Sequence, residues 1–256
     1  MGTRPGLDPR PDLDPSADLG LDRRTVREEV VVVLMLSLLA SAVYAIIDLL
    51  TAPIAGVYVA AADQSALLAT QIAHFVFGLA PVFLVLHLLR RSGEGARGIG
   101  LDAGRPAQDL GRGALLFAIV GTLGVGVYLL SVQLGANRFV VPVPPLHHWW
   151  TVPALVLNAV EAALKEEVIV VAYLVTRLRQ LGWSDRRSVA VSGVLRGAYH
   201  LYQGFGGFTG NLGMGLLFAW MFTRTRRAWP FVVAHVLLDV GAGAGYLLFR
   251  KHLPGF

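Results

Sequence analysis

Long apolar blocks separated by short polar segments dominate the chain. They cover roughly residues 30–50, 66–90, 113–134, 152–175, 188–204, 209–223 and 229–249. A helix needs about 20 apolar residues to cross the ~30 Å hydrocarbon core of a bilayer, and most of the blocks are about that long. The fifth and sixth blocks are shorter and contain glycine, which is typical of helices shielded from lipid inside a bundle. The pattern predicts an all-α, polytopic membrane helix bundle of about seven transmembrane helices.

The amino-acid composition agrees with a membrane protein. Of the 256 residues, 55% are hydrophobic and 15% are charged, whereas soluble domains carry about 25% charged residues. The absence of cysteine excludes disulfides, thiolate metal sites and a cysteine nucleophile. A pI of 9.9 could indicate nucleic-acid binding, but the basic residues lie between apolar blocks and no nucleic-acid module is visible. We therefore expect the lipid bilayer as a partner, and no nucleic acid.

Basic residues fall mainly on one side of the predicted bundle. Before the first block and after the second, fourth and sixth blocks stand 17 of the 22 Lys and Arg residues. Only Arg138, Arg250 and Lys251 fall on the other side. The positive-inside rule then predicts a cytoplasmic N-terminus and a C-terminus outside. Lysine is nearly absent beside arginine, which is typical of a GC-rich bacterial genome, so we expect a multi-pass protein of the bacterial plasma membrane.

The chain divides into a tail, two groups of helices and a short end. The first apolar block has the basic and apolar regions of a signal peptide, but the apolar run continues past Ala42, which favours an uncleaved helix. In the outer loop "VPVPPLHHWW", His147 and His148 could bind a metal, although an interfacial loop is the favoured interpretation. The expected segments are a disordered cytoplasmic tail (1–29), three N-terminal transmembrane helices (30–149), a bundle of four helices (150–249) and a C-terminal tail (250–256).

The last four blocks contain eight ionisable side chains. Each costs about 2.5–3.5 kcal/mol at the centre of a bilayer, so membrane proteins keep such groups mainly where they pair or work. Spacing by four residues puts the members of each of three pairs on one helix face. The residues are the pair Glu161 and Lys165, the pair Arg196 and His200, the pair His235 and Asp239, and the adjacent Glu166 and Glu167.

These groups form a set that can polarise water. Glu161 and Lys165 are interpreted as a self-neutralised ion pair. Glu166 and Glu167 point about 100° apart on a regular helix, so one can work while the other orients or pairs. Carboxylates and imidazoles together favour hydrolysis by a water nucleophile. A structural network and a proton- or ion-coupled transporter are the alternatives, although no inverted repeat is visible.

Three stretches of the sequence resemble a known family. The stretches "EEVIVVAYLVTRLRQLGW", "LRGAYHLYQGFGGFTGNLGMGLLFAWMFTRT" and "PFVVAHVLLD" are similar to motifs of the CPBP family of intramembrane proteases. That family comprises the type II CAAX prenyl endopeptidases and bacterial relatives, some linked to bacteriocin processing or immunity (Abi-like proteins). The resemblance covers roughly residues 150–245. It implies an intramembrane endopeptidase that cleaves a membrane-associated or lipidated peptide, with a catalytically inactive immunity or scaffold protein as the alternative.

The resemblance also implies roles for particular residues. Glu166 would be the base that activates water, and Glu167 the supporting carboxylate beside it. His200 would position the water, and His235 would contribute to the oxyanion site. The family is often called a metalloprotease, and Glu166, His200 and His235 are candidate ligands for a divalent metal such as zinc. A metal-free glutamate–histidine mechanism fits the resemblance equally well.

Three positions depart from the family pattern. Val171 stands where the family usually has an arginine, and Arg196 stands where it has an aromatic residue. Asp239 takes the place of an asparagine, and an ionised aspartate cannot donate a hydrogen bond to an oxyanion. We hypothesise that the missing positive charge has moved: Arg196 pairs with Glu167 and leaves Glu166 free for water beside His200.

Overall fold

The computed structural model describes residues 23–51, 57–59, 68–142 and 149–249. The two termini and the histidines His147 and His148, for which metal binding was considered, lie outside the described residues. The described part is a bundle of helices, which confirms the all-α fold. The elements are α1 (Arg23–Met35), α2 (Leu38–Thr51), β1 (Val57–Val59), α3 (Leu68–Gly78), α4 (Ala80–Arg91), α5 (Gly95–Gly98), α6 (Pro106–Gln133), β2 (Phe139–Val141), α7 (Thr151–Glu166), the π-helix η1 (Glu167–Tyr173), α8 (Leu174–Gln180), α9 (Asp185–Tyr199), the 3₁₀ turn η2 (Leu201–Gln203), α10 (Phe205–Thr225) and α11 (Trp229–Phe249).

The first two apolar blocks form interrupted helices. Between α1 and α2 the axis bends by 49° at Leu36 and Ser37, where the Ser37 hydroxyl donates to the Val33 carbonyl. Such bonding of serine to the preceding turn bends helices. Between α3 and α4 the interruption falls at Leu79, two residues before Pro81, which has no N–H to donate. The first helix also begins at Arg23, so 23–29 belong to a helix and not to the expected tail.

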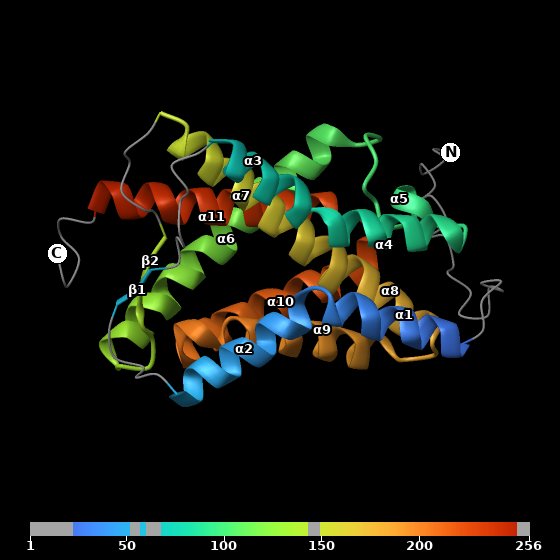
Figure 1. The fold of residues 1–256 in the computed structure, drawn as a ribbon, viewed down its shortest axis with the longest axis horizontal. Helices are drawn as coiled ribbons and strands as arrows, with labels where there is room; N and C mark the ends of the chain where they lie inside the picture. The colour runs from blue at the N-terminus through green and yellow to red at the C-terminus, as the bar shows by residue number, and fades with distance from the viewer. Residues whose placement is uncertain (1–22, 52–56, 60–67, 143–148, 250–256) are drawn as a thin grey trace, which may run out of the picture.

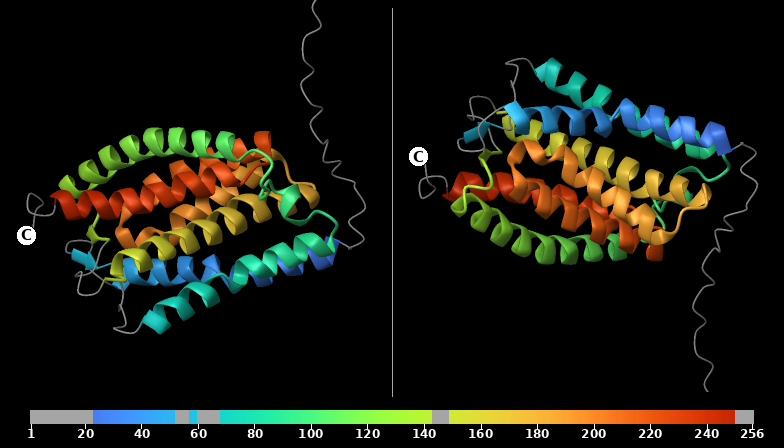
Figure 2. Two further views of the ribbon diagram at one scale, coloured as in Figure 1. Left: turned by 90° about the horizontal axis from the view of Figure 1, so that it is seen from above. Right: turned by 90° about the horizontal axis from the view of Figure 1, so that it is seen from below.

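The remaining helices surround one long, buried helical rod. The elements α7, η1 and α8 run without a break through the middle of the bundle (Figure 1). Residues 168–175 of this rod have relative exposures of at most 1% and form the centre of the hydrophobic core. On one side α9 lies along α10, and on the other α6 lies along α11 (Figure 2). Side chains of η1 are therefore shielded from both lipid and water.

Arginine side chains link the helix ends at the end of the molecule where α1 begins and α5 lies (Figure 1). Arg227 bonds Asp109 at 2.6 Å and Asp102 at 3.3 Å, which joins the α10–α11 turn to the start of α6. A hydrogen bond from the Gly104 N–H, with a smaller contribution from Arg227, lowers the pKa of Asp102 below its ordinary value. Arg177 is fully buried and donates to the Leu88 carbonyl at 3.1 Å. These contacts fix the arginine-rich ends of the helices to one another.

The opposite end holds two short strands that the apolar pattern did not predict. Strands β1 and β2 pair in parallel, with Val57 opposite Phe139. Next to β2, the backbone of Asn137 pairs with that of Gly204 at the start of α10. Gly204 has a φ of 109°, and a Cβ there would lie 2.6 Å from the Ala136 carbonyl, so the pairing requires glycine. The segment before β2 therefore lies directly against the turn that follows α9.

The length and mean hydropathy of a helix show whether it is able to cross a membrane. Among the described residues three helical stretches pass both criteria, Gln71–Arg91, Pro106–Gln133 and Trp229–Phe249. A fourth is added when the bent α1–α2 pair is counted as one span. The charged rod and the short α9 fall outside these criteria. The architecture is a membrane helix bundle, and the count of seven stays a prediction.

Candidate active site

The two adjacent glutamates lie where the central helix changes its winding. Glu166 is the last residue of α7, and Glu167 is the first of the seven-residue π segment η1. A π turn contains more residues than an α turn, so consecutive side chains diverge less than the expected 100°. Both carboxylates thus face the same neighbours: oxygens of Glu166 and Glu167 and a nitrogen of His235 all lie within 4.8 Å of one another.

Arg196 joins this group from α9. Its Nη1 donates to Glu167 Oε1 at 2.6 Å, and both side chains are fully buried. The predicted pairing of Arg196 with Glu167 is therefore confirmed. The other part of the hypothesis needs correction, because Arg196 Nη2 also lies 3.3 Å from Glu166 Oε2. The guanidinium is planar and carries two terminal nitrogens, so one arginine can serve both carboxylates.

Gly215 makes room for the Arg196 side chain, and Gly193 lets α9 and α10 approach each other. A Cβ on Gly215 of α10 would lie 2.9 Å from Arg196 Cδ and 3.0 Å from the Cα of Gly193 on α9. Helices α9 and α10 can approach this closely only because both positions lack side chains. The ring of Phe218, also on α10, lies 5.8 Å from the guanidinium carbon and covers it.

Tyr199 is a site residue that the sequence analysis missed. Its hydroxyl donates to Glu166 Oε2 at 2.8 Å, and the side chain is buried. Tyr199 stands directly before His200, so the only sequence signal was a tyrosine next to a candidate residue, and its spacing predicted no partner. Glu166 Oε2 consequently has two neighbours, Tyr199 and Arg196, whereas no hydrogen bond to Oε1 comes from the described part of the chain.

His235 approaches the glutamates from α11. Its Nδ1 lies 2.7 Å from Glu167 Oε1. An ionised carboxylate can only accept, so Nδ1 carries the proton and donates. The contact of 3.2 Å between Arg196 Nη2 and the same Nδ1 then joins two donors and is not a hydrogen bond. On the far side of the ring, His235 Nε2 lies 3.6 Å from Asp239 Oδ2, which is a pairing distance only if the imidazole is charged.

His200 lies just beyond the end of α9 and does not belong to the compact group. Its Nδ1 is 3.0 Å from the carbonyl oxygen of Arg196. A carbonyl can only accept, so Nδ1 carries the proton and Nε2 presents a lone pair when the ring is neutral. The rings of Tyr199 and Tyr202 lie 4.8 and 6.1 Å from the imidazole. The Arg196 carbonyl thus fixes both the position and the tautomer of the His200 ring.

The turn that follows His200 is held by the segment before β2. Asn137 Oδ1 accepts from the Gly207 N–H at 2.7 Å, which caps the first turn of α10. Arg138 donates to the Tyr202 carbonyl at 2.9 Å and pairs with Asp48 of α2. The charge pattern of the sequence put Arg138 among the few basic residues on the outer side and predicted no partner for it. Its contacts show that Arg138 also has a structural role, because they connect α2 to the turn beside His200.

Glu161 and Lys165 form the ion pair expected from their spacing. Lys165 Nζ donates to Glu161 Oε1 at 2.6 Å. The pair lies on α7 directly before the two glutamates, and it is separate from the group around Arg196. Its charges therefore compensate each other and do not neutralise Glu166 or Glu167.

Glu166, Glu167 and His235 have the spacing that a metal ion could use. The Arg196 guanidinium, however, lies 2.6 Å from Glu167, 3.3 Å from Glu166 and 3.2 Å from His235, so it takes the place that a cation would need. A metal ion bound by these three residues would lie close to the guanidinium, and two positive charges so close together repel strongly in a buried site. His200, the third candidate ligand, is not in the group. As arranged, the residues do not fit a metal ion.

The comparisons with known proteins agree with the resemblance drawn from the motifs. Residues 148–241 match the family described as type II CAAX prenyl endopeptidase Rce1-like. Searches of the curated proteins and of the solved structures returned no match. The matched region contains α7 to α10 and the first part of α11, and so all the residues gathered around Arg196. The match confirms the CPBP resemblance over this region, which is less than half of the chain of a multi-pass membrane protein, and the matched family consists of peptidases.

Proposed function

We propose that this member of the type II CAAX prenyl endopeptidase family hydrolyses a peptide bond of a membrane-associated or lipidated substrate by activating water with Glu166 and His200. The observation that carries the proposal is that the two oxygens of Glu166 differ in their hydrogen-bond partners. Oxygen Oε2 is held by Tyr199 at 2.8 Å and lies 3.3 Å from Arg196. Oxygen Oε1 is left for a ligand that donates a proton, and water is such a ligand.

The orientation of His200 supports the same role. Because Nδ1 is committed to the Arg196 carbonyl, the lone pair of Nε2 can accept a hydrogen from a water molecule. One water would then be held by two acceptors, a carboxylate and an imidazole. Such a water has both hydrogens bound and an oxygen lone pair free to attack a carbonyl carbon. The arrangement needs no covalent intermediate, which suits a chain without cysteine.

The proposed reaction balances with water as the only co-reactant. The water oxygen bonds to the peptide carbonyl carbon as Glu166 takes one proton from the water. The tetrahedral intermediate collapses, the carbon–nitrogen bond breaks, and Glu166 gives the proton to the leaving nitrogen. For His235 to stabilise the oxyanion, Nε2 must also carry a proton, since Nδ1 donates to Glu167. Asp239, 3.6 Å from Nε2, would then be the counter-ion of the imidazolium.

The test uses the full chain reconstituted in phosphatidylcholine vesicles. Peptides with and without a C-terminal prenyl group are incubated with wild type, Glu166→Gln and His200→Ala, and the products are identified by mass spectrometry. We expect cleavage by wild type and a loss of about 10²- to 10⁴-fold in kcat for Glu166→Gln, because the general base is removed. Glu28→Gln, which changes the same residue type at an exposed position of α1, is the matched control and should retain activity.

The outcomes separate this function from its alternatives. Cleavage by Glu166→Gln at near wild-type rate would contradict a role for Glu166 as the base. Absence of cleavage by wild type across the peptide set, with normal insertion and thermal stability, would contradict the peptidase function and favour a scaffold or immunity role.

A further inference from the structure

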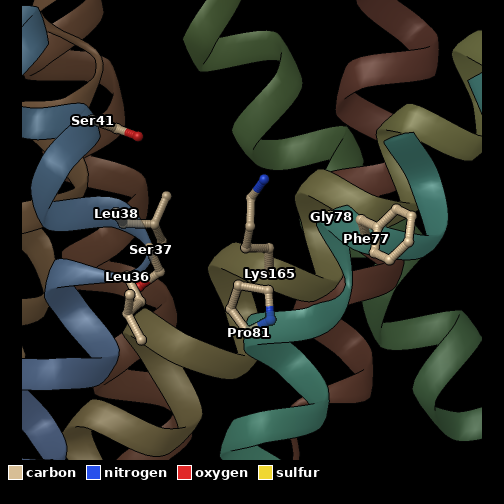
Figure 3. A pocket seen from close by; sticks show the side chains of 8 residues that line it. All are labelled: Leu36, Ser37, Leu38, Ser41, Phe77, Gly78, Pro81 and Lys165. Atoms are coloured by element: carbon tan, nitrogen blue, oxygen red, sulfur yellow. The ribbon is translucent and has the colours of Figure 1, made fainter. Parts of the chain in front are cut away.

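A second polar site lies beside the glutamates, at the two helix interruptions. The α1–α2 bend and the α3–α4 interruption face each other across a cavity of about 170 Å³, and Lys165 of α7 stands between them (Figure 3). Its lining includes Ser37, Leu38 and Ser41 from the first pair of helices and Phe77 and Pro81 from the second. The cavity is large enough for one apolar side chain of a peptide or about five water molecules.

The interruptions give this cavity polar groups that a membrane helix normally hides. Pro81 has no N–H, so the Phe77 carbonyl lacks the donor that a regular helix would supply. The Ser37 hydroxyl is used by the Val33 carbonyl, which leaves its lone pairs as acceptors. Irregular backbone at membrane depth is stable where it lines a cavity with polar contents. The site therefore favours a ligand that brings its own N–H groups, such as an extended peptide.

Lys165 adds a positive charge to the wall of this cavity. Its ammonium has three N–H groups, and Glu161 is the one partner found for them in the described part of the chain. A Cβ on Gly78 would lie 2.5 Å from Glu161 Oε1, so this carboxylate is seated against the α3 backbone. Glu161 thus keeps the ammonium at the cavity, with two N–H groups left to bind an anionic or carbonyl oxygen.

The cavity adjoins the site around Glu166 in two ways. Lys165 directly precedes Glu166 in the chain. Leu38, which lines the cavity, also packs in a buried cluster with Tyr199, and Tyr199 is the residue that donates to Glu166. One residue along α7 therefore separates the Lys165 wall of the cavity from Glu166. On the other route, the Tyr199 side chain alone lies between Leu38 and the Glu166 carboxylate. The mouth is bordered by Leu36 and Phe77, which are 64% and 75% exposed, so it opens toward the lipid-facing surface.

We propose that the cavity binds the carboxylate-bearing end of the peptide substrate, with Lys165 as the residue that binds the carboxylate. This inference rests on the proposed peptidase function and names the substrate group that the site recognises. The carboxylate can be the chain terminus or an acidic side chain near it. A lipid headgroup fits less well, because Lys165 lies midway along the rod Thr151–Gln180, about 20 Å from either end.

The test measures binding separately from cleavage. A fluorescent apolar peptide is prepared in three forms: with a free C-terminal carboxylate, with a C-terminal amide, and as the amide with aspartate as the last residue. Equilibrium binding is measured to the full chain in phosphatidylcholine vesicles, and KM and kcat are measured on the same peptides. The key variant is Lys165→Met combined with Glu161→Gln, which removes the charge without leaving a buried carboxylate unpaired. Lys165→Arg keeps the charge and serves as the conservative variant.

We expect the double variant to bind carboxylate peptides on the order of 10- to 100-fold more weakly, with KM raised similarly, kcat little changed and the amide unaffected. Lys165→Arg should recover most of the affinity. Binding of the first form alone identifies the chain terminus, and binding of the third as well identifies a side chain. A pocket-filling variant, Ser41→Phe, should weaken all three peptides, whereas the lipid-facing Val43→Phe should not.

Equal affinity of wild type and the double variant for all three peptides would overturn the inference while leaving cleavage intact. Binding that depends on Lys165 without any cleavage would instead overturn the peptidase function and leave the site standing. Loss of peptide binding on addition of phosphatidylglycerol, seen in wild type and absent in the double variant, would assign the cavity to a lipid anion and also overturn the inference.

Discussion

Arg196 Nη1 lies 2.6 Å from Glu167 Oε1, and neither side chain is exposed. The pair explains how a membrane helix can hold two adjacent carboxylates: a single guanidinium from the neighbouring helix contacts both. Removing one partner of a buried ion pair typically costs about 3–5 kcal/mol, because the other charge is left uncompensated. The position that usually supplies this charge in the family is Val171, which is fully buried in the π segment.

Replacing Tyr199 with phenylalanine should weaken the site without dismantling it. The change removes the 2.8 Å hydrogen bond to Glu166 Oε2 and leaves the contact with Arg196. We expect a loss of about 1 kcal/mol of stability, the net value of one hydrogen bond, and a fall of about 10-fold in kcat. Thermal unfolding and steady-state kinetics measure both. Tyr44→Phe, at an exposed position of α2, is the control, and equal kinetics for the two variants would contradict the role given to Tyr199.

Chelation should leave activity unchanged. Arg196 lies between the potential ligands Glu166, Glu167 and His235, at distances that a second cation could not share. We expect the same rate of cleavage before and after treatment with EDTA or phenanthroline, and less than one equivalent of zinc in the purified protein. Inactivation by chelator that is reversed by added zinc would show that Arg196 moves out and a metal enters.

Replacing Asn137 with alanine should affect catalysis through the turn beside His200. Asn137 caps α10 by accepting from the Gly207 N–H at 2.7 Å, and loss of such a cap costs about 0.5–2 kcal/mol. We expect kcat to fall several-fold with KM nearly constant, since the turn positions His200 and not the substrate. The control is Asn211→Ala, whose amide donates to the Gly207 carbonyl within its own helix. A change in KM alone would argue against this positioning role.

Spacing and charge predicted the contacts that are short in sequence or obligatory in a membrane. The i,i+4 rule gave the Glu161–Lys165 pair. The Arg196–Glu167 pair came from the need to compensate a buried carboxylate together with the resemblance, which implies an arginine at the position that Val171 occupies.

The remaining features depend on segments that are distant in the sequence. A π segment has the same residues as an α-helix, and only the hydrogen-bond pattern of the folded rod distinguishes it. The sequence therefore predicted divergent glutamates where the structure has converging ones. Tyr199 reaches Glu166 across two helices, and Asn137 reaches Gly207 across 70 residues. No local pattern marks such contacts. The interruption near Pro81, by contrast, could have been predicted from the proline. It was not, because residues 66–90 were interpreted as one continuous span.

An exchange of the charged position tests whether Arg196 supplies the positive charge that the two glutamates need. Cleavage rate and thermal stability are measured for Arg196→Phe, Val171→Arg and the double variant in the same vesicles. Arg196→Phe alone should lose activity and about 3–5 kcal/mol of stability, because Glu167 is left unpaired. Val171→Arg alone should also be destabilised, since it adds a second buried cation. The double variant returns the arginine to the position four residues after Glu167, and we predict that it recovers both stability and cleavage. A double variant no more stable or active than Arg196→Phe would contradict the account.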